Sequence, residues 1–191
     1  MNDPVWTTIE QRLTQILSMP HNVIYLREQF DTTPAAAVER RMRELRSGIA
    51  GTPIEETFTG PRLFLRVVGP PTPRGGPYSG EWWFDADLEQ SLEGAYSRIY
   101  FRSADRKAAV RDMLRELLAI SANWNPMTEV WALEAPAGQQ LVGYTGPGAA
   151  QPLIAGQPLS AKGNRLLAGG VRQIYFPVKN PFWVKQYRQL A

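Results

Sequence analysis

Apolar side chains recur at helical spacing through the first fifty residues. In the opening segment they are Val5, Trp6, Ile9, Leu13, Ile16 and Leu17. Asp3-Pro4 and Thr33-Pro34 each place an N-cap residue before a proline, which favours the start of a helix. Met19-Pro20 interrupts the first segment, "HNVIYLREQF" at 21–30 follows it, and Gly48 closes the third. The pattern predicts three helices before residue 50.

Near residue 60 the helical spacing gives way to short runs of apolar, aromatic and β-branched residues. These runs occupy residues 62–68, 80–84, 128–134 and 172–178. We expect all four to be strands of one β system. Pro177 marks the edge or the end of the last one, because proline cannot donate to a sheet ladder.

The segments between these strands are expected to hold one long helix, a loop and two short elements. The helix begins at Ser103 or Asp105 and carries a single apolar stripe. The stripe consists of Val110, Met113, Leu114, Leu117 and Leu118. A short helix is expected from Asp85 to residue 96 and a strand at 97–101. Residues 139–165 are interpreted as mostly loop, because glycine and proline are frequent there.

Helices come first and a strand-dominated remainder follows, which is typical of an α+β architecture. We expect an N-terminal helical lobe at residues 1–50 and a second domain at residues 60–191. A chain of 191 residues with 43% hydrophobic content is long and apolar enough for a packed core of this kind.

Composition removes several kinds of chemistry. The chain has no cysteine, which excludes disulfides, thiolate nucleophiles and zinc–thiolate sites. Its one histidine, His21, excludes a multi-histidine metal site, and we expect no metal. His21 also lies in a helical segment far from any candidate serine turn, which argues against a Ser-His-Asp triad.

Charge and hydropathy indicate where the protein works. No apolar run is long enough to cross a membrane, and the first ten residues lack a basic-then-apolar signal pattern. We therefore expect no membrane partner, and either a cytoplasmic protein or one delivered into a target cell by another machine. The net charge of +3 only slightly favours a nucleic-acid partner.

The third helix carries Arg40, Arg41, Arg43 and Arg46. We interpret these four arginines as a solvated helix face. A partner-binding surface is the alternative.

Two polar features lie inside or next to predicted strands. Arg66 interrupts an apolar strand, so it either points to solvent or faces an anion such as phosphate, which suits its planar guanidinium. Ser79 comes shortly before Trp82 and Trp83, which are either core residues or an aromatic wall for a planar ring. Glu81 is an exposed strand residue or an acid group.

A third feature is the glycine pair Gly169-Gly170 before a strand start. Two glycines permit positive φ angles and a close backbone approach to a ligand. Gln173 follows them as a polar residue on an otherwise apolar strand. The arrangement indicates either a site or only a tight turn.

Four motifs occur in a telling order: "LFLRVVGP", "SGEWWF", "GYTGPGAAQ" and "LLAGGVRQIYFP". Together they resemble toxin domains of the ADP-ribosyltransferase superfamily, in particular C-terminal domains of bacterial polymorphic toxins. The likeness covers residues 62 to 184. It implies a split, curved β core with NAD bound in its cleft, so that residues 60–191 would be the catalytic domain.

The resemblance also implies roles for single residues. Arg66 would match the first-strand arginine that holds an NAD phosphate or the nicotinamide ribose. Ser79 to Trp83 would shape the nicotinamide pocket, and Gly169-Gly170 would belong to the cofactor-binding turn. Gln173 would fall where the superfamily carries a catalytic glutamate or a Gln-x-Glu pair.

The implied activity is a mono-ADP-ribosyltransferase toxin or effector that transfers ADP-ribose from NAD to a protein or a nucleic acid, with an immunity protein as a possible partner. The chain departs from the pattern because Tyr175 stands two residues after Gln173, where a glutamate is usual. Either Gln173 acts in a variant site, or Glu81 or Glu129 supplies the carboxylate, or the domain is inactive. The remaining alternatives are a catalytically inactive binding module and an unrelated α+β interaction domain.

Overall fold

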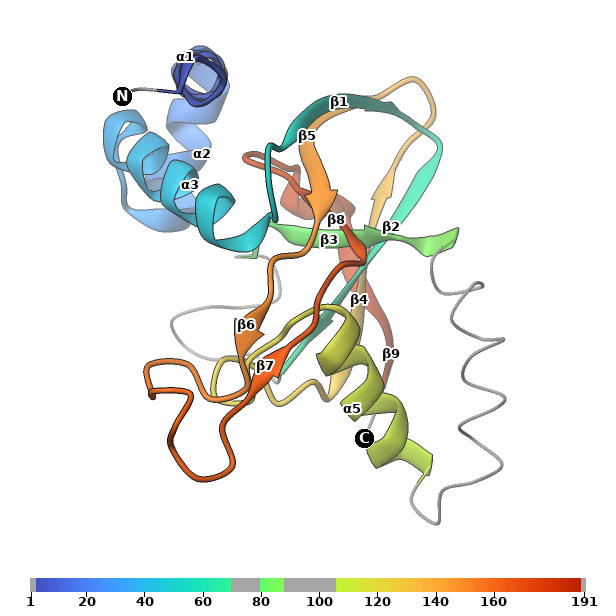
Figure 1. Cartoon of the computed structure of the whole chain (residues 1–191). Coiled ribbons are helices and arrows are strands. Elements are labelled where there is room, and N and C mark those ends of the chain that lie inside the picture. The colour runs from blue at the N-terminus through green and yellow to red at the C-terminus, as the bar shows by residue number, and fades with distance from the viewer. Residues whose placement is uncertain (1–2, 70–79, 88–105, 190–191) are drawn as a thin grey trace.

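The computed structural model describes residues 3–69, 80–87 and 106–189. It is an α+β structure built on an antiparallel sheet of seven strands, with helices on its outer faces (Figure 1). The described helices are α1 (Pro4–Leu17), α2 (Pro20–Phe30), α3 (Pro34–Gly48) and α5 (Arg106–Leu117). The strands of the large sheet are β1 (Ile54–Thr59), β2 (Arg62–Val68), β3 (Trp82–Asp85), β4 (Glu129–Ala135), β5 (Gln140–Pro147), β8 (Arg172–Tyr175) and β9 (Val184–Gln189). The strands β6 (Gln151–Pro152) and β7 (Leu166–Leu167) form a small separate hairpin, and η2 (Pro181–Trp183) is a 3-10 turn before β9.

The three N-terminal helices begin and end where the sequence predicts. The Asp3 carboxylate accepts a hydrogen bond from the Val5 amide at 3.0 Å, and the Thr33 hydroxyl accepts one from the Ala36 amide at 3.3 Å. Each side chain thus satisfies one of the free amides of a first turn. The helix expected from Ser103 or Asp105 is α5, which the structure describes from Arg106 onward.

The four predicted strands belong to one sheet, in the order β1-β5-β8-β3-β2-β4-β9. The interpretation of residues 139–165 as mostly loop is wrong, because β5 lies there between β1 and β8. Its glycines are strand residues that leave room for neighbours. A Cβ on Gly143 would lie 3.0 Å from the Phe176 ring, and one on Gly146 would lie 2.5 Å from the Ile49 side chain. The strands β1 and β9 were not expected.

Strand β3 joins two halves of this sheet. Trp82 and Trp83 pair with β8, whereas Phe84 and Asp85 pair with β2. One half therefore consists of β1, β5 and β8, and the other of β2, β4 and β9 (Figure 1). The two halves face each other across an aromatic core. In this core the ring centroids of Phe58 on β1 and Phe64 on β2 are 5.2 Å apart.

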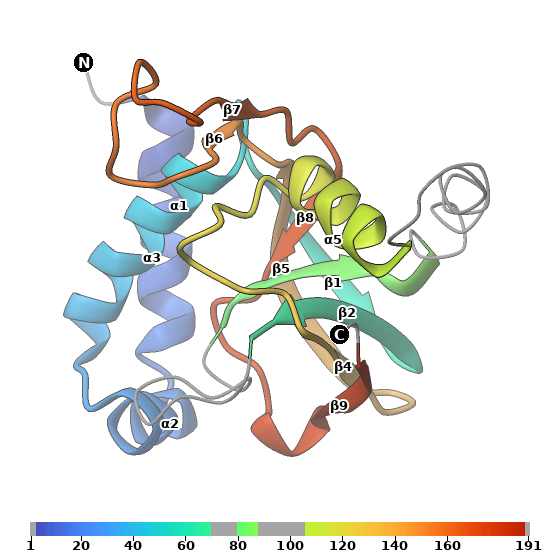
Figure 2. The same cartoon turned by 90° about the horizontal axis from the view of Figure 1, so that it is seen from below.

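Helices cover the outer face of each half (Figure 2). The helices α1, α2 and α3 pack on Tyr144 of β5 and Tyr175 of β8. Helix α5 packs with Leu114 and Leu118 on the outer face of β2, β3 and β4. The helical segment thus shares a hydrophobic core with the sheet, and its role as a separate lobe stays a prediction.

The solvated arginine face predicted on α3 is wrong for Arg41. Only 1% of this residue is exposed, and its Nη1 lies 2.7 Å from Oε1 of Glu81, just before β3. Its Nε donates to the carbonyl of Pro177 at 3.1 Å. Arg40 also reaches Glu81, at 2.9 Å, while Arg43 is exposed. Because a buried charge is costly without a partner, this ion pair fixes how α3 docks on the sheet.

Parts of the predicted pattern fall outside the described residues. These parts are Ser79, the strand at 97–101 and most of the helix expected from Asp85 to residue 96. Asp85 itself ends β3, and its carboxylate accepts hydrogen bonds from Arg62 and Arg172. None of the helices in the described segments is long and apolar enough to span a membrane.

The buried ion pair gives a first prediction. We expect Arg41→Ala to lower the free energy of unfolding by about 3 kcal/mol, because Glu81 and the Pro177 carbonyl lose their buried donor. Urea unfolding followed by circular dichroism measures this change. Arg43→Ala, on the same helix but exposed, is the control and should change it by less than about 0.5 kcal/mol. Equal effects of the two substitutions would contradict the assigned role of Arg41.

Candidate functional site

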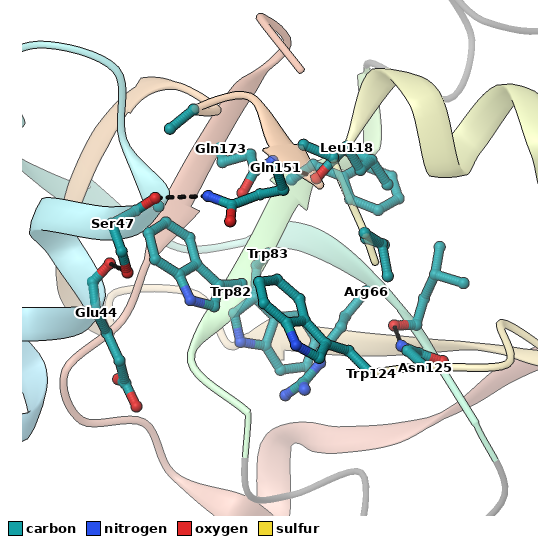
Figure 3. A pocket seen from close by; sticks show the side chains of 16 residues that line it. Glu44, Ser47, Arg66, Trp82, Trp83, Leu118, Trp124, Asn125, Gln151 and Gln173 are labelled. Atoms are coloured by element: carbon teal, nitrogen blue, oxygen red, sulfur yellow. Dashed lines mark hydrogen bonds between the residues drawn. The ribbon is translucent and has the colours of Figure 1, made fainter. Parts of the chain in front are cut away.

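A pocket of about 470 Å³ lies where β3 parts from β2. The two strands are paired only through Phe64–Asp85 and Leu65–Phe84, and the next residues along each strand, Arg66 and Trp83, both line the pocket. Helix α3 borders one side of the pocket, and the segment after α5 borders the other (Figure 3). The side chains labelled in Figure 3 are Glu44, Ser47, Arg66, Trp82, Trp83, Leu118, Trp124, Asn125, Gln151 and Gln173.

Arg66 lines this pocket, and glycine at position 80 gives it room. A Cβ on Gly80 would lie only 1.0 Å from Nη1 of Arg66. This Nη1 is buried and has no hydrogen-bond partner within the part of the chain that the structure describes. Burial lowers the pKa of the guanidinium, and Glu81 and Glu44 act in the opposite direction. An arginine keeps its charge even so, and a free buried donor of this kind favours an anionic ligand.

The two predicted tryptophans differ in their exposure. Trp83 is 1% exposed, and its indole N–H donates to the Gly80 carbonyl at 3.2 Å, so that it belongs to the core beneath the pocket. Trp82 is half-buried and lies edge-on to Tyr175, with ring centroids 4.8 Å apart. Its ring also packs against Gly48, where a Cβ would lie 2.3 Å from an indole carbon. Trp82 is therefore a fixed wall of the pocket.

A second aromatic wall, Trp124, was missed by the sequence analysis. It lines the pocket with 59% of its surface exposed. Its loop is anchored by Arg115, which donates to the carbonyls of Ile120 and Asn125, and by Asn125, whose side chain donates to the Val67 carbonyl at 2.8 Å. The stretch "SANWNP" offered a signal, because a tryptophan among turn residues has no apolar neighbours in sequence.

Gln173 lines the same pocket as Arg66, but its amide nitrogen is already in use. Its Nε2 donates to the Leu118 carbonyl at 2.8 Å and thereby ties β8 to the end of α5. The amide nitrogen of Gln151 likewise donates to the Ser47 carbonyl at 2.6 Å (Figure 3). Each amide therefore has its oxygen and its second N–H left for a ligand.

The glycine pair has the positive φ angles expected of it, 64° at Gly169 and 84° at Gly170. The close backbone contact that the pair permits is made with another segment of the chain. A Cβ on Gly169 would lie 2.6 Å from the Gly148 carbonyl oxygen, and the Gly169 amide donates to the Glu116 carbonyl. Neither glycine is among the residues that line the pocket. A contact with a cofactor stays a prediction for both.

The two stand-in carboxylates of the sequence analysis, Glu81 and Glu129, are occupied elsewhere. Glu81 is buried and paired with Arg40 and Arg41. Glu129 accepts a hydrogen bond from the Trp131 indole at 2.7 Å. The acidic side chain that lines the pocket, within the part of the chain that the structure describes, is Glu44 of α3. The sequence gives no sign of this, because only the docking of α3 brings Glu44 there.

Lys179 is a buried cation that interacts electrostatically with Glu81, Arg66 and Arg41, and it is not among the residues that line the pocket. It is 2% exposed, and its Nζ is 6.0 Å from the centroid of the Trp83 ring. The pKa of Lys179 is lowered to about 7, mainly by burial; the charge of Glu81 raises it, and the nearby arginines, including Arg66, lower it. A lysine in such a place is close to losing its proton at neutral pH.

No group of three or more His, Cys, Asp or Glu side chains in the described segments could hold a metal ion. Comparison with models of known protein families gives no match, and neither does comparison with curated proteins.

The lowered pKa of Lys179 gives a second prediction. The unfolded lysine keeps its proton up to about pH 10.5, whereas the folded one loses it above about pH 7, so that the unfolded chain binds more protons in this window. We therefore expect the free energy of unfolding to rise between pH 7 and 9, by at most about 3 kcal/mol. Lys179→Met should flatten this rise in urea unfolding, and Lys162→Met, at an exposed position, should not. An unchanged slope in Lys179→Met would refute the assignment.

The bond between Gln173 and Leu118 gives a third prediction. In Gln173→Glu a carboxylate replaces the donor that faces the Leu118 carbonyl, so we expect a loss of about 1–3 kcal/mol of stability at pH 7. The loss should shrink at acidic pH, where a protonated glutamate can donate again. Thermal and urea unfolding at pH 7 and pH 4.5 test this, with Gln140→Glu at an exposed position as control. Unaltered stability of Gln173→Glu at pH 7 would show that the bond contributes nothing.

Proposed function

We propose that the protein binds NAD in the pocket at the strand split and transfers ADP-ribose from it to a protein or a nucleic acid. One observation supports this above the others. The pocket combines the guanidinium of Arg66, whose Nη1 has no hydrogen-bond partner in the described segments, with the indole walls of Trp82 and Trp124. These are the residues that a ligand with phosphates and planar rings requires.

The chemistry of NAD matches this combination in two ways. Its pyrophosphate is an anion with oxygens that a planar guanidinium can bind in a bidentate manner. Its nicotinamide is a cationic ring, which is attracted to the face of a tryptophan. A volume of about 470 Å³ is within the range of small-molecule sites and suits the nicotinamide half of the molecule with its phosphates.

A catalytically inactive NAD-binding module is the second candidate. It is favoured by the occupied amide of Gln173 and by the pairing of Glu81 and Glu129 with other residues. The unrelated interaction domain is less well supported. An interaction domain would use the arginines of α3 to bind its partner. Arg41 is buried and Arg40 is paired with Glu81, so these two are less available for a partner.

Nicotinamide release tests the activity directly. The purified chain is incubated with NAD labelled in the nicotinamide ring, and with NAD labelled in the adenylate part together with lysate protein and RNA. We expect free nicotinamide and labelled macromolecules. NAD binding without nicotinamide release would support the binding module instead, and absence of both would refute the proposal.

Three substitutions at two positions test whether the ligand binds in the pocket. We expect Arg66→Ala to abolish detectable NAD binding in calorimetry with little change in melting temperature, because Nη1 of Arg66 has no hydrogen-bond partner among the described residues. Arg66→Lys should fail as well, since lysine lacks the planar fork. Trp124→Ala should weaken binding about tenfold or more through lost stacking. The control is Phe182→Ala, which removes an aromatic ring that is 93% exposed and outside the pocket. Unchanged NAD affinity in both Arg66→Ala and Trp124→Ala would place the ligand elsewhere.

A further inference from the structure

Helix α3 brings a carboxylate to the pocket from outside the strand-rich segment. Glu44 lies in the last turns of α3 and lines the pocket together with Ser47 and Gly48 (Figure 3). The Tyr175 hydroxyl donates a hydrogen bond to its Oε2, and Nε of Arg40 lies 3.6 Å from its Oε1. Tyr175 is the residue two positions after Gln173 on β8. A tyrosine on the sheet thus holds a carboxylate that comes from the helix.

Glu44 is both held in place and accessible. Its side chain is 32% exposed, whereas that of Glu81 is 8% exposed and has both neighbouring arginines on one oxygen. The end of α3 is fixed against the pocket wall, because Gly48 packs on the ring of Trp82. The same helix end therefore positions both the carboxylate and the aromatic wall.

The surroundings of Glu44 also suit a proton acceptor. Burial raises the pKa of its carboxyl, and the charge of Glu81 raises it further, while the hydrogen bond from Tyr175 lowers it. The pKa of Tyr175 is raised well above its usual value, mainly by burial, so that its hydroxyl remains a donor to Glu44. A carboxylate with a raised pKa in a cleft is a candidate for acid–base work.

We propose that Glu44 is the catalytic carboxylate of the pocket and that Tyr175 is its positioning residue, an inference that rests on the proposed reaction with NAD. The bond between C1′ of the ribose and the nicotinamide nitrogen breaks, and its electron pair stays on that nitrogen and neutralises the ring. The positive charge that develops on C1′ and the ring oxygen of the ribose is stabilised by the carboxylate of Glu44. The acceptor then bonds to C1′, and its proton passes to Glu44.

Three comparisons favour Glu44 over the other candidates. Gln173 has no negative charge, and its amide nitrogen is bound to Leu118. Glu81 lies behind the pocket in its ion pair, and Glu129 is bound to Trp131. Among the described residues that line the cavity, Glu44 is the acidic one.

Glu44→Gln is the central experiment, because it keeps the shape of the side chain and an oxygen that accepts from Tyr175 while it removes the charge. We expect nicotinamide release from NAD to fall by about 100-fold or more, with the NAD dissociation constant changed less than about threefold. Glu39→Gln, at an exposed position of the same helix, is the matched control and should retain full activity.

Tyr175→Phe supplies a second readout that a purely structural role would not move. Without the hydroxyl the pKa of Glu44 rises further, so the acidic limb of the rate–pH profile should shift to higher pH. Melting temperatures of both variants are measured alongside. If Glu44→Gln is unfolded, the rate–pH profile of Tyr175→Phe decides the question. A folded, active Tyr175→Phe whose acidic limb is not shifted overturns the inference.

The outcomes separate this inference from the proposed function. If the parent consumes NAD and Glu44→Gln keeps more than half of the rate, Glu44 is not catalytic and the proposed function stands. If Glu44→Gln loses NAD binding in proportion to its rate, Glu44 is a binding residue and the inference is overturned. If the parent neither binds nor consumes NAD, the proposed function fails, and the inference falls with it.

Discussion

The ion pair between Arg41 and Glu81 is the interaction on which the geometry of the pocket depends. Its two charges are almost removed from water, so they are tolerable only in contact with each other. For the two side chains to meet, α3 must pack against the start of β3 with a defined position along its axis and a defined rotation about it. The same placement sets Gly48 against Trp82 and brings Glu44 within reach of Tyr175. A buried polar contact thus gives the docking a specificity that apolar packing alone does not provide.

The charges that the described residues bring near this pair do not balance. The cations of the cluster are Arg40, Arg41, Arg66 and Lys179, and its carboxylates are Glu44 and Glu81. An excess of positive charge in a low-dielectric place is unfavourable, and either proton loss from Lys179 or a bound anion relieves it. Anion binding and proton loss from Lys179 are linked, because an anion beside Arg66 would raise the pKa of Lys179 and so help it to keep its proton.

Local signals in the sequence predicted the elements whose form depends on local physics. Proline with an N-cap residue defined α1 and α3, and the apolar runs defined β2 and β4. Strand β5 could not be recognised, because its glycines are explained only by distant side chains such as Phe176. Of the site, Arg66, Trp82 and Gln173 were predicted to meet and do line one pocket. Arg41, Glu44 and Trp124 were misread or missed, because their surroundings are made by contacts between segments far apart in sequence.

The shared strand β3 has a mechanical consequence. Only four residues long, it divides its pairing between the two half-sheets, so each half is attached to it through two residues. A short strand of this kind resists shear weakly and can act as a pivot between the halves. Since the pocket lies in the gap beside it, a rotation of one half against the other would widen or narrow the opening. A ligand bound in the pocket would contact both half-sheets, so its binding would restrict their motion relative to each other.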